Sequence, residues 1–168
     1  MYWIALLPSH EDERIAWGWR ALQFTPRVAQ VDEALLLEVS ACERLWGGRK
    51  RLLRRLLQQC EPLAAPQWAQ GETSLIALAL LRLQLRGEAQ PERRLPQDLP
   101  LEALTAARDH VPTLERTGCR TWGELRALPR GGVSRRFGAG LLDALDAAYG
   151  ERPERYPWLQ LPEVFDLK

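Results

Sequence analysis

The run ALLLEVS at 34–40 limits the fold of this chain more than any other stretch. It has the length of a strand, and it lacks the regular polar alternation of a strand with one solvated face. Strands of this kind lie in the middle of a sheet that is covered on both sides. The run therefore predicts a central strand between two layers of helices.

Other segments complete a small unit of strands and helices. YWIALLP at 2–8 predicts a buried strand that ends at Pro8, and PQWAQ at 66–70 predicts another. FTPRVAQV at 24–31 predicts a turn followed by extended chain. The spacing of apolar residues predicts helices at 15–23, from Arg49 onward after a break at Gly47-Gly48, and at 72–86.

The second half of the chain has a different pattern. Residues 87–97 combine Gly, Pro and mixed charge and predict a linker, and four short helices are expected in 98–150. Thr121 and Glu124 have the spacing of a capping box, Pro112 suits a first helical turn, and Gly118 suits a helix end. The Pro-rich segment 151–168 predicts an extended tether. The expected class is α+β.

The composition of the chain excludes several classes of protein. Hydrophobic residues make up 46% and charged residues 27%, as in globular proteins. The net charge of +1 gives no overall basic field, although a local patch can still bind nucleic acid. The three cysteines, at 42, 60 and 119, are far apart, which argues against a disulfide framework and predicts a reducing, cytoplasmic setting. No run reaches the roughly 20 apolar residues of a membrane span.

Three stretches carry a resemblance to a known family. LLLEVSACERLWGG at 35–48 resembles the palm strand and following turn of Y-family (UmuC/DinB-type) translesion DNA polymerases. WAQGETSLIALAL at 68–80 resembles their later palm segment, and 99–150 resembles their thumb. The whole is most similar to the ImuB-like, catalytically degenerate members of that family. The resemblance implies a reduced palm-like subdomain at 1–86 without fingers, a thumb-like subdomain at 98–150, and a tether at 151–168 toward a little-finger region that this sequence lacks.

The chain departs from the family where the polymerases hold metal and triphosphate. Leu6, Leu7 and Pro8 stand where the first strand of the family ends in a metal-binding Asp. Thr73-Ser74 stands where the family has Asn-Lys. Because two-metal phosphoryl transfer requires carboxylates that hold both ions, a Leu in that place cannot contribute.

Asp32 and Glu33 are the remaining candidates for metal ligands, and their alignment with the family is open. Without a bulge in the following strand, only Glu33 falls on a carboxylate position of the family. With one extra residue absorbed by a bulge, both residues do. The pair is then a solvated strand entry, a vestigial site without metal, or a working pair of ligands.

The resemblance implies a non-catalytic accessory protein of DNA damage tolerance that contacts DNA through its thumb and needs no cofactor. It implies as partners DNA, an error-prone polymerase of the replicative type, a RecA-like companion subunit and the sliding clamp, and no membrane. One alternative is an active nucleotidyltransferase with Mg²⁺ on Asp32 and Glu33. Another is a protein-binding scaffold without a DNA role, in which the segment 130–136 is salt-bridged internally.

The predicted DNA contact is PRGGVSRRFG at 129–138, taken as a loop. Glycine allows a backbone to approach phosphate and arginine neutralises it, which selects Arg130, Gly131, Gly132, Arg135 and Arg136. The alternative is a charged loop between helices.

Three further stretches are candidate contacts. Trp17 and Trp19 cannot share one helical face, so one of them is exposed as an anchor for a partner or both flank the core. GGRKRLLRR at 47–55 is a helix with a solvated face or binds phosphate or a partner. QLPEVF at 160–165 resembles peptides that dock on sliding clamps.

Overall fold

A four-stranded antiparallel sheet organises the fold, in the order β2-β3-β1-β4. The computed structural model describes residues 1–58 and 63–160. The strands are β1 Trp3–Leu7, β2 Val28–Val31, β3 Ala34–Glu38 and β4 Gln67–Gly71. The α-helices are α1 Arg14–Leu22, α2 Arg49–Leu57, α3 Ser74–Leu85, α4 Val111–Arg116, α5 Trp122–Ala127, α6 Arg130–Phe137 and α7 Ala139–Ala148. The 3-10 turns are Glu11–Glu13, Ser40–Cys42, Arg44–Trp46, Pro91–Arg93, Pro96–Asp98, Leu101–Ala103 and Thr105–His110. The predicted α+β class is confirmed.

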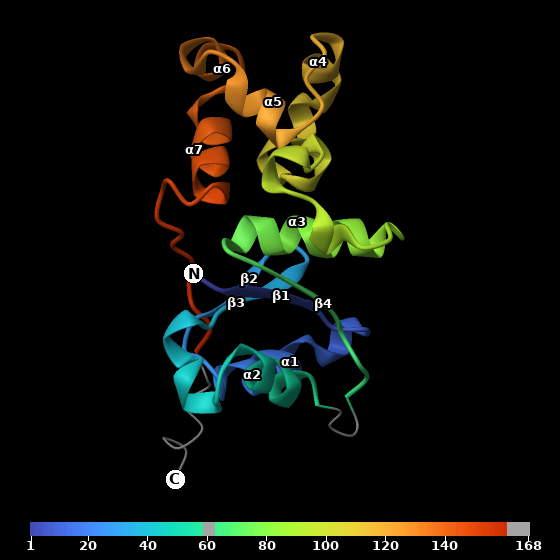
Figure 1. Ribbon diagram of the computed structural model, residues 1–168, viewed down its shortest axis with the longest axis vertical. Coiled ribbons are helices and arrows are strands. Elements are labelled where there is room, and N and C mark those ends of the chain that lie inside the picture. Colours follow the sequence, from blue (N-terminus) through green and yellow to red (C-terminus); the bar gives the residue numbers. More distant parts are fainter. Residues whose placement is uncertain (59–62, 161–168) are drawn as a thin grey trace.

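The run that most limited the fold is a central strand, as predicted. All five residues of β3 are buried, and β3 pairs with β1 on one side and β2 on the other. Leu35 and Leu37 point toward α1 and α2, whereas Ala34 and Leu36 point toward α3. Figure 1 shows the resulting layers, with α1 and α2 below the sheet and α3 above it. Apolar side chains on both faces explain why the run has no polar alternation.

The chain needs glycine where it turns into α2. Gly47 and Gly48 both have positive φ, 80° and 104°, a conformation that is costly for other residues. Gly48 is also the residue whose carbonyl accepts the first helical bond, from Leu52 at 3.0 Å. The predicted break at these glycines is confirmed, and it aims Leu52 and Leu56 at the sheet.

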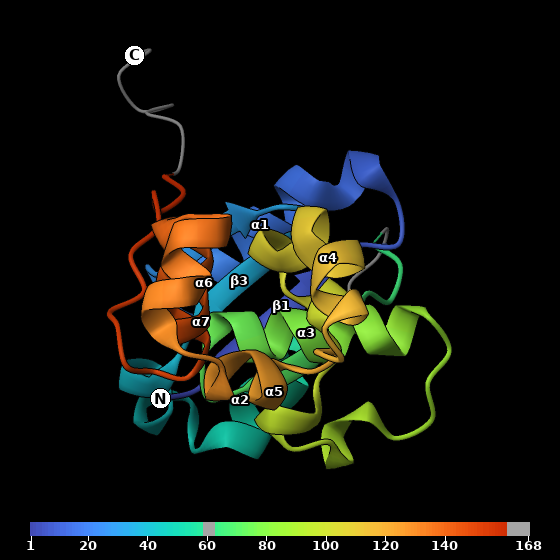
Figure 2. The same ribbon diagram turned by 90° about the horizontal axis from the view of Figure 1, so that it is seen from above.

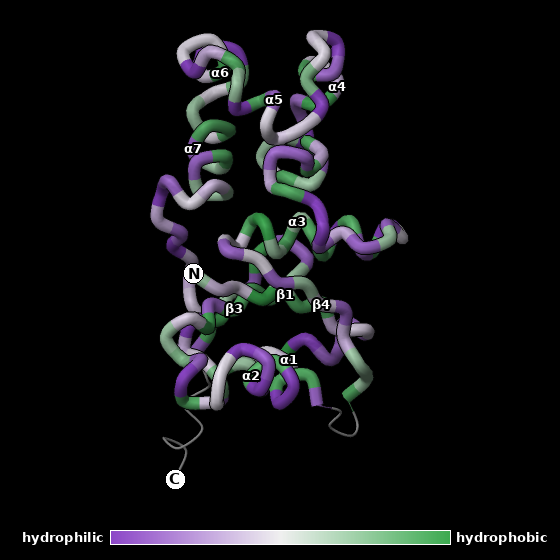
Figure 3. Tube along the Cα trace, in the orientation of Figure 1, coloured by the Kyte–Doolittle hydropathy of each residue, from purple (hydrophilic) through white to green (hydrophobic). Residues whose placement is uncertain are grey.

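α3 is apolar around its circumference because it lies between two layers. The sheet covers one side, and the helices that follow cover the other (Figure 2). Thr73 caps its start by accepting a hydrogen bond from the Ile76 amide at 3.2 Å. In Figure 3 the hydrophobic residues are concentrated along the strands and α3.

The helices of 98–150 differ in part from the prediction. The Thr121 half of the capping box is confirmed, since Thr121 Oγ1 accepts from the Glu124 amide at 3.2 Å, but Glu124 Oε1 accepts from the Arg120 amide, at 3.1 Å, in place of the Thr121 amide. Pro112 lies in the first turn of α4, and Gly118 has a positive φ of 85° just beyond that helix. The first predicted helix is instead two 3-10 turns, Leu101–Ala103 and Thr105–His110. The segment 129–138, predicted as a loop, forms α6.

One hydrophobic cluster joins the sheet to this helical unit. It runs from Trp3 and Leu36 through α3 to Trp122 and Leu145. Within 87–97, the predicted linker, Pro91 is buried. The predicted palm-like and thumb-like units therefore share a core. In the described part of the chain, no helix combines the length and the apolar character that crossing a membrane needs.

The described part of the predicted tether, 151–160, is extended and docked on the molecule. It runs from α7 past one edge of the sheet (Figure 1). The Leu159 amide donates to the Val28 carbonyl of β2 at 2.7 Å, and Trp158 stacks on Trp3 with ring centroids 6.3 Å apart. Gly18 of α1 leaves room for Leu159, since an added Cβ would lie 3.3 Å from Leu159 Cδ1. We call residues 151–160 the tail.

Candidate functional site

Asp32 and Glu33 form the turn of the β2–β3 hairpin. Val31 pairs with Ala34, so these two acidic residues are the only ones between the strands. Asp32 has a φ of 51°, a left-handed conformation that Asp tolerates better than most residues. The register runs without interruption along β3 on both sides, which leaves no bulge there. The uninterrupted register favours the alignment in which only Glu33 falls on a carboxylate position of the polymerase family.

Both carboxylates are bound by one buried arginine. Arg82 of α3 is 6% exposed and donates from Nε and Nη2 to the two oxygens of Glu33, at 2.9 and 2.8 Å. Nη2 also donates to Asp32 Oδ2 at 3.2 Å, and Nη1 donates to the Ala103 carbonyl at 3.0 Å. Asp32 Oδ2 accepts a further bond from Thr105 Oγ1 at 2.7 Å. The group therefore connects the hairpin, α3 and the start of the helical unit.

This arrangement opposes a divalent cation. The hydrogen bond from Arg82 lowers the pKa of Glu33 despite partial burial, because the guanidinium stabilises the carboxylate. A metal ion on the same oxygens would lie beside the positive charge of Arg82 and would have to displace its hydrogen bonds. Mg²⁺ needs oxygens that are free to complete its coordination.

Glu33→Gln should remove an acid-sensitive contribution to stability. The pKa of Glu33 in the folded state lies below its ordinary value of 4.5. The carboxylate therefore stabilises the fold above that ordinary value, and this contribution is lost as the pH falls through the folded-state pKa. We expect the difference in free energy of unfolding between wild type and Glu33→Gln to be largest near about pH 6 and to shrink toward about pH 3.

Urea denaturation over this pH range measures that difference. Glu92→Gln, which changes an exposed residue of the turn Pro91–Arg93, controls for the loss of one negative charge. A difference for Glu33→Gln that stays constant over the range would show that the Arg82 contact is not formed in solution.

The end of β1 offers no carboxylate to the hairpin turn of Asp32 and Glu33. Leu6 pairs with Leu35 near the start of β3, so the first strand does end beside the hairpin. Leu6 is fully buried, and Leu7 and Pro8 follow it. Within residues 1–58 and 63–160, no three side chains of His, Cys, Asp and Glu are grouped as a metal site.

The start of α3, where the family has its Asn-Lys, is closed by the tail. The Ser74 amide donates to both oxygens of Glu154, at 3.0 and 3.1 Å, and the Ser74 hydroxyl also bonds to Glu154. Tyr156 OH lies 2.5 Å from the same hydroxyl. Burial raises the pKa of Glu154 even though Ser74 donates to it. A helix N-terminus attracts anions, and here an internal carboxylate already occupies that position.

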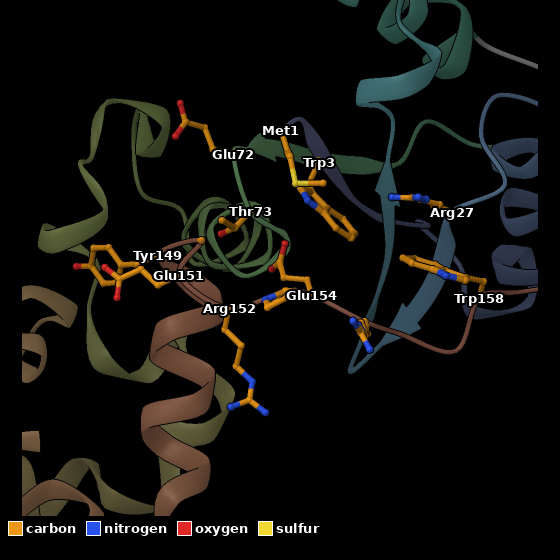
Figure 4. Close-up of a pocket in the computed structure, with 13 residues that line it drawn as sticks. Met1, Trp3, Arg27, Glu72, Thr73, Tyr149, Glu151, Arg152, Glu154 and Trp158 are labelled. Carbon is orange, nitrogen blue, oxygen red and sulfur yellow. The ribbon is translucent and has the colours of Figure 1, made fainter. Parts of the chain in front are cut away.

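A cavity of about 670 Å³ lies beside this contact (Figure 4). Figure 4 shows Glu154 reaching toward the start of α3, where Thr73 lies. The charged lining consists of Arg27, Arg152 and Arg155 together with Glu72, Glu151 and Glu154. The two signs balance, so the cavity has no excess positive charge for a triphosphate. Ser74 also precedes Arg82 by about two helical turns, about 12 Å, so the cavity is separate from the hairpin.

The predicted DNA contact is the surface of α6. The prediction of a loop in this segment is wrong. Gly131 and Gly132 lie in the first turn of the helix, where backbone N–H groups have no helical partner. Arg130 donates to both oxygens of Asp146 at 3.0 and 2.9 Å, and this pairing lowers the pKa of Asp146. Arg135 bonds only to the Gly131 carbonyl, at 3.2 Å. In the described residues, Arg135 and Arg136 have no acidic partner.

The two tryptophans of α1 have different environments. Trp17 is 1% exposed and lies in the core beneath the sheet, so it cannot serve as the predicted contact for a partner. Trp19 is 45% exposed and lines a shallow apolar cavity with Ile15 and Leu159. Residues 161–165 of the clamp-like stretch lie outside the described residues.

Arg82 and Glu154 are the residues of these sites that sequence reasoning missed. Arg82 interrupts the apolar run of α3, and a charge inside such a run signals a buried partner. Glu154 lies among prolines and charged residues, and no local pattern distinguishes it. Each meets its partner far along the chain, 49 residues away for Arg82 and Glu33 and 80 for Ser74 and Glu154.

Comparison with known proteins adds one similarity. Over an alignment of 138 residues, which covers 79% of this chain, the chain is 30% identical to Protein ImuB of Caulobacter vibrioides, in strain NA1000/CB15N and in strain ATCC 19089/CIP 103742/CB 15. The chain spans 30% of the length of these two curated relatives. No protein-family model matches the chain. The similarity supports the predicted ImuB-like relationship.

Proposed function

From the similarity to ImuB, we propose that this chain is a polymerase-like protein without catalytic activity that serves DNA damage tolerance. In this role it contacts DNA through its thumb-like helices and helps to place a separate, error-prone polymerase. A RecA-like companion subunit and the sliding clamp are the further partners that the resemblance implies.

One observation carries the non-catalytic part of the proposal. The two places where the resemblance puts the polymerase sites for metal and triphosphate are both occupied by partners within this chain. Arg82 binds Asp32 and Glu33, and Glu154 binds the start of α3. A polymerase would need to break both contacts, and it would still lack the carboxylate that Leu6 or Leu7 replaces.

The DNA contact rests on α6. Arg135 and Arg136 are exposed at the end of the molecule formed by the helical unit (Figure 1). Gly131 and Gly132 leave the surface beside the helix start open, since an added Cβ at Gly132 would meet nothing within 4 Å. Open backbone N–H groups and arginines without acidic partners are the groups that hold a phosphate backbone. Arg130, bound to Asp146, contributes less.

Arg135→Glu/Arg136→Glu should weaken DNA binding. We expect the affinity for a fluorescent primed duplex, measured by anisotropy, to fall at least about tenfold, because two phosphate contacts are replaced by repulsion. The slope of log affinity against log salt should decrease by about 2. Arg93→Glu/Arg155→Glu is the matched control, since it makes the same charge change at two exposed arginines outside α6.

Equal affinity and equal salt slope in the α6 variant and the wild type would refute the DNA contact at α6, and a wild type without affinity for the duplex would favour the scaffold without a DNA role. Primer extension with Mg²⁺ and all four nucleotides tests the catalytic alternative, with Asp32→Ala/Glu33→Ala as the control. Extension by the wild type that disappears in this control would establish an active polymerase and refute the proposal.

A further inference from the structure

A second cationic surface lies on α2, at the opposite end of the molecule from α6 (Figure 1). α2 carries Arg49, Lys50, Arg51, Arg54 and Arg55 and no acidic residue. Its Leu52 and Leu56 are 0% exposed and pack under the sheet. The helix therefore has one side fixed to the core and another that is almost entirely cationic.

Most of this charge is not neutralised. Arg49 is paired with Glu43 at 2.9 Å. The other four cations, Lys50, Arg51, Arg54 and Arg55, are exposed and form no ion pair with any residue of the described ranges. We call these four residues the α2 basic face. The whole chain has a net charge of only +1, so the face concentrates positive charge that is balanced elsewhere.

Neighbouring side chains fix the two ends of helix α2. Arg20 of α1 donates to the last carbonyls of α2, from Nε to Leu56 at 2.9 Å and from Nη2 to Arg55 at 2.7 Å. The guanidinium of Arg49 lies 4.3 Å from the ring centroid of Tyr2 at the start of the helix. A helix fixed at both ends loses little backbone freedom when the cations that it carries bind a partner.

The composition of the face favours phosphate over a protein partner. Protein interfaces have an apolar centre and keep charged residues at the rim. Here the leucines of α2 pack toward the core, and the large exposed apolar side chains near the helix are Leu45 and Met1, 82% and 70% exposed. Three of the four cations are arginines, whose planar donors match phosphate oxygens. We propose that the α2 basic face binds the phosphate backbone of a nucleic acid, as a contact separate from α6.

The position of the face determines what it can bind. The sheet and α3 lie between α2 and the helical unit, and packed layers are about 10 Å apart. A short duplex that lies on α6 therefore cannot also lie on α2. The chain should bind two separate segments of nucleic acid, one at each end. The part of this inference that concerns two segments rests on the proposed function of α6.

The test is Arg51→Glu/Arg54→Glu with a labelled duplex of about 10 base pairs, one helical turn. We expect native mass spectrometry to find two duplexes on the wild type and one on this variant. The salt slope measured by anisotropy should decrease by about 2. Arg51→Gln/Arg54→Gln, checked by circular dichroism, should give a smaller loss in the same direction, and Arg93→Glu/Arg155→Glu is again the control.

Unchanged stoichiometry and salt slope in folded Arg51→Glu/Arg54→Glu protein would overturn the assignment. Poly-glutamate of equal charge is the second probe, and binding it as tightly as the duplex would point instead to an acidic protein. Failure of the α6 proposal has a different signature. In that case Arg135→Glu/Arg136→Glu keeps every bound duplex, whereas the α2 variant loses the only one.

Discussion

Arg82→Met should destabilise the protein by about 2–3 kcal/mol, one of the two largest effects that we expect. The substitution removes all the donors that bind Asp32, Glu33 and the Ala103 carbonyl. Breaking a buried ion pair from one side costs about 3–5 kcal/mol. The value is lower here because Asp32 and Glu33 are 39% and 37% exposed and water can reach them.

Urea denaturation of Arg82→Met beside Arg86→Met measures this effect. Arg86 lies on the same helix and pairs with Glu102, but both side chains are exposed, so its loss should cost less than about 1 kcal/mol. Equal losses in the two variants would show that Arg82 does not join the hairpin to α3 and the helical unit.

Asp32→Asn/Glu33→Gln distinguishes this structural role from metal binding. If the carboxylates serve Arg82, neutralising them leaves a buried cation without partners and destabilises the protein. The loss should be much less than additive when it is combined with Arg82→Met, because both changes remove the same contacts. Two carboxylates kept together for a metal repel each other, so their neutralisation would instead leave stability unchanged or raise it.

Trp122→Ala should cost about 3–5 kcal/mol, the loss expected for a large aromatic residue removed from a core. Trp122 is 0% exposed, and its indole Nε1–H donates to the Pro100 carbonyl at 3.0 Å. Its ring also packs edge-on against Tyr149, with centroids 6.4 Å apart. The cavity left behind would lie in the cluster that joins the helical unit to α3.

Because that cluster is continuous, the sheet and the helical unit should unfold together in one transition. Far-UV circular dichroism and tryptophan fluorescence should therefore give the same midpoint in urea. Trp19→Ala, which changes a residue that is 45% exposed, is the matched control and should cost less than about 1 kcal/mol. Two separate transitions in Trp122→Ala would mean that the palm-like and thumb-like units are independent domains.

The elements that could be predicted are those that local rules determine. β3 follows from an apolar run of strand length, α3 from apolar spacing, and the start of α5 from a capping box. Each signal lies within about one helical turn or one strand of the element that it specifies. Asp32 and Glu33 could be placed at the entry to β3, but their role could not be predicted, because Arg82 is distant in the sequence.

α6 shows why the remaining structure was missed. Its residues include Gly131 and Gly132, which disfavour a helix by about 1 kcal/mol each, so the segment was predicted as a loop. In the fold, Val133 is buried against the core, and Phe137 packs against the same cluster. Four residues apart, they form one side of a helix, and packing overrides propensity. The same limit applies to Glu154, whose role depends on the return of the tail to the start of α3.

The docking of the tail has a consequence for biosynthesis. β1 leaves the ribosome about 10–30 s before Trp158 and Leu159 do, at ordinary rates of translation. Until then Trp3 lacks its stacking partner and the outer edge of β2 lacks the bond to the Leu159 amide. An open strand edge is a template for pairing with other chains. The sheet is thus completed by the tail, which is made after it, and in the nascent chain the edge of β2 is open to wrong associations until the tail has been synthesised.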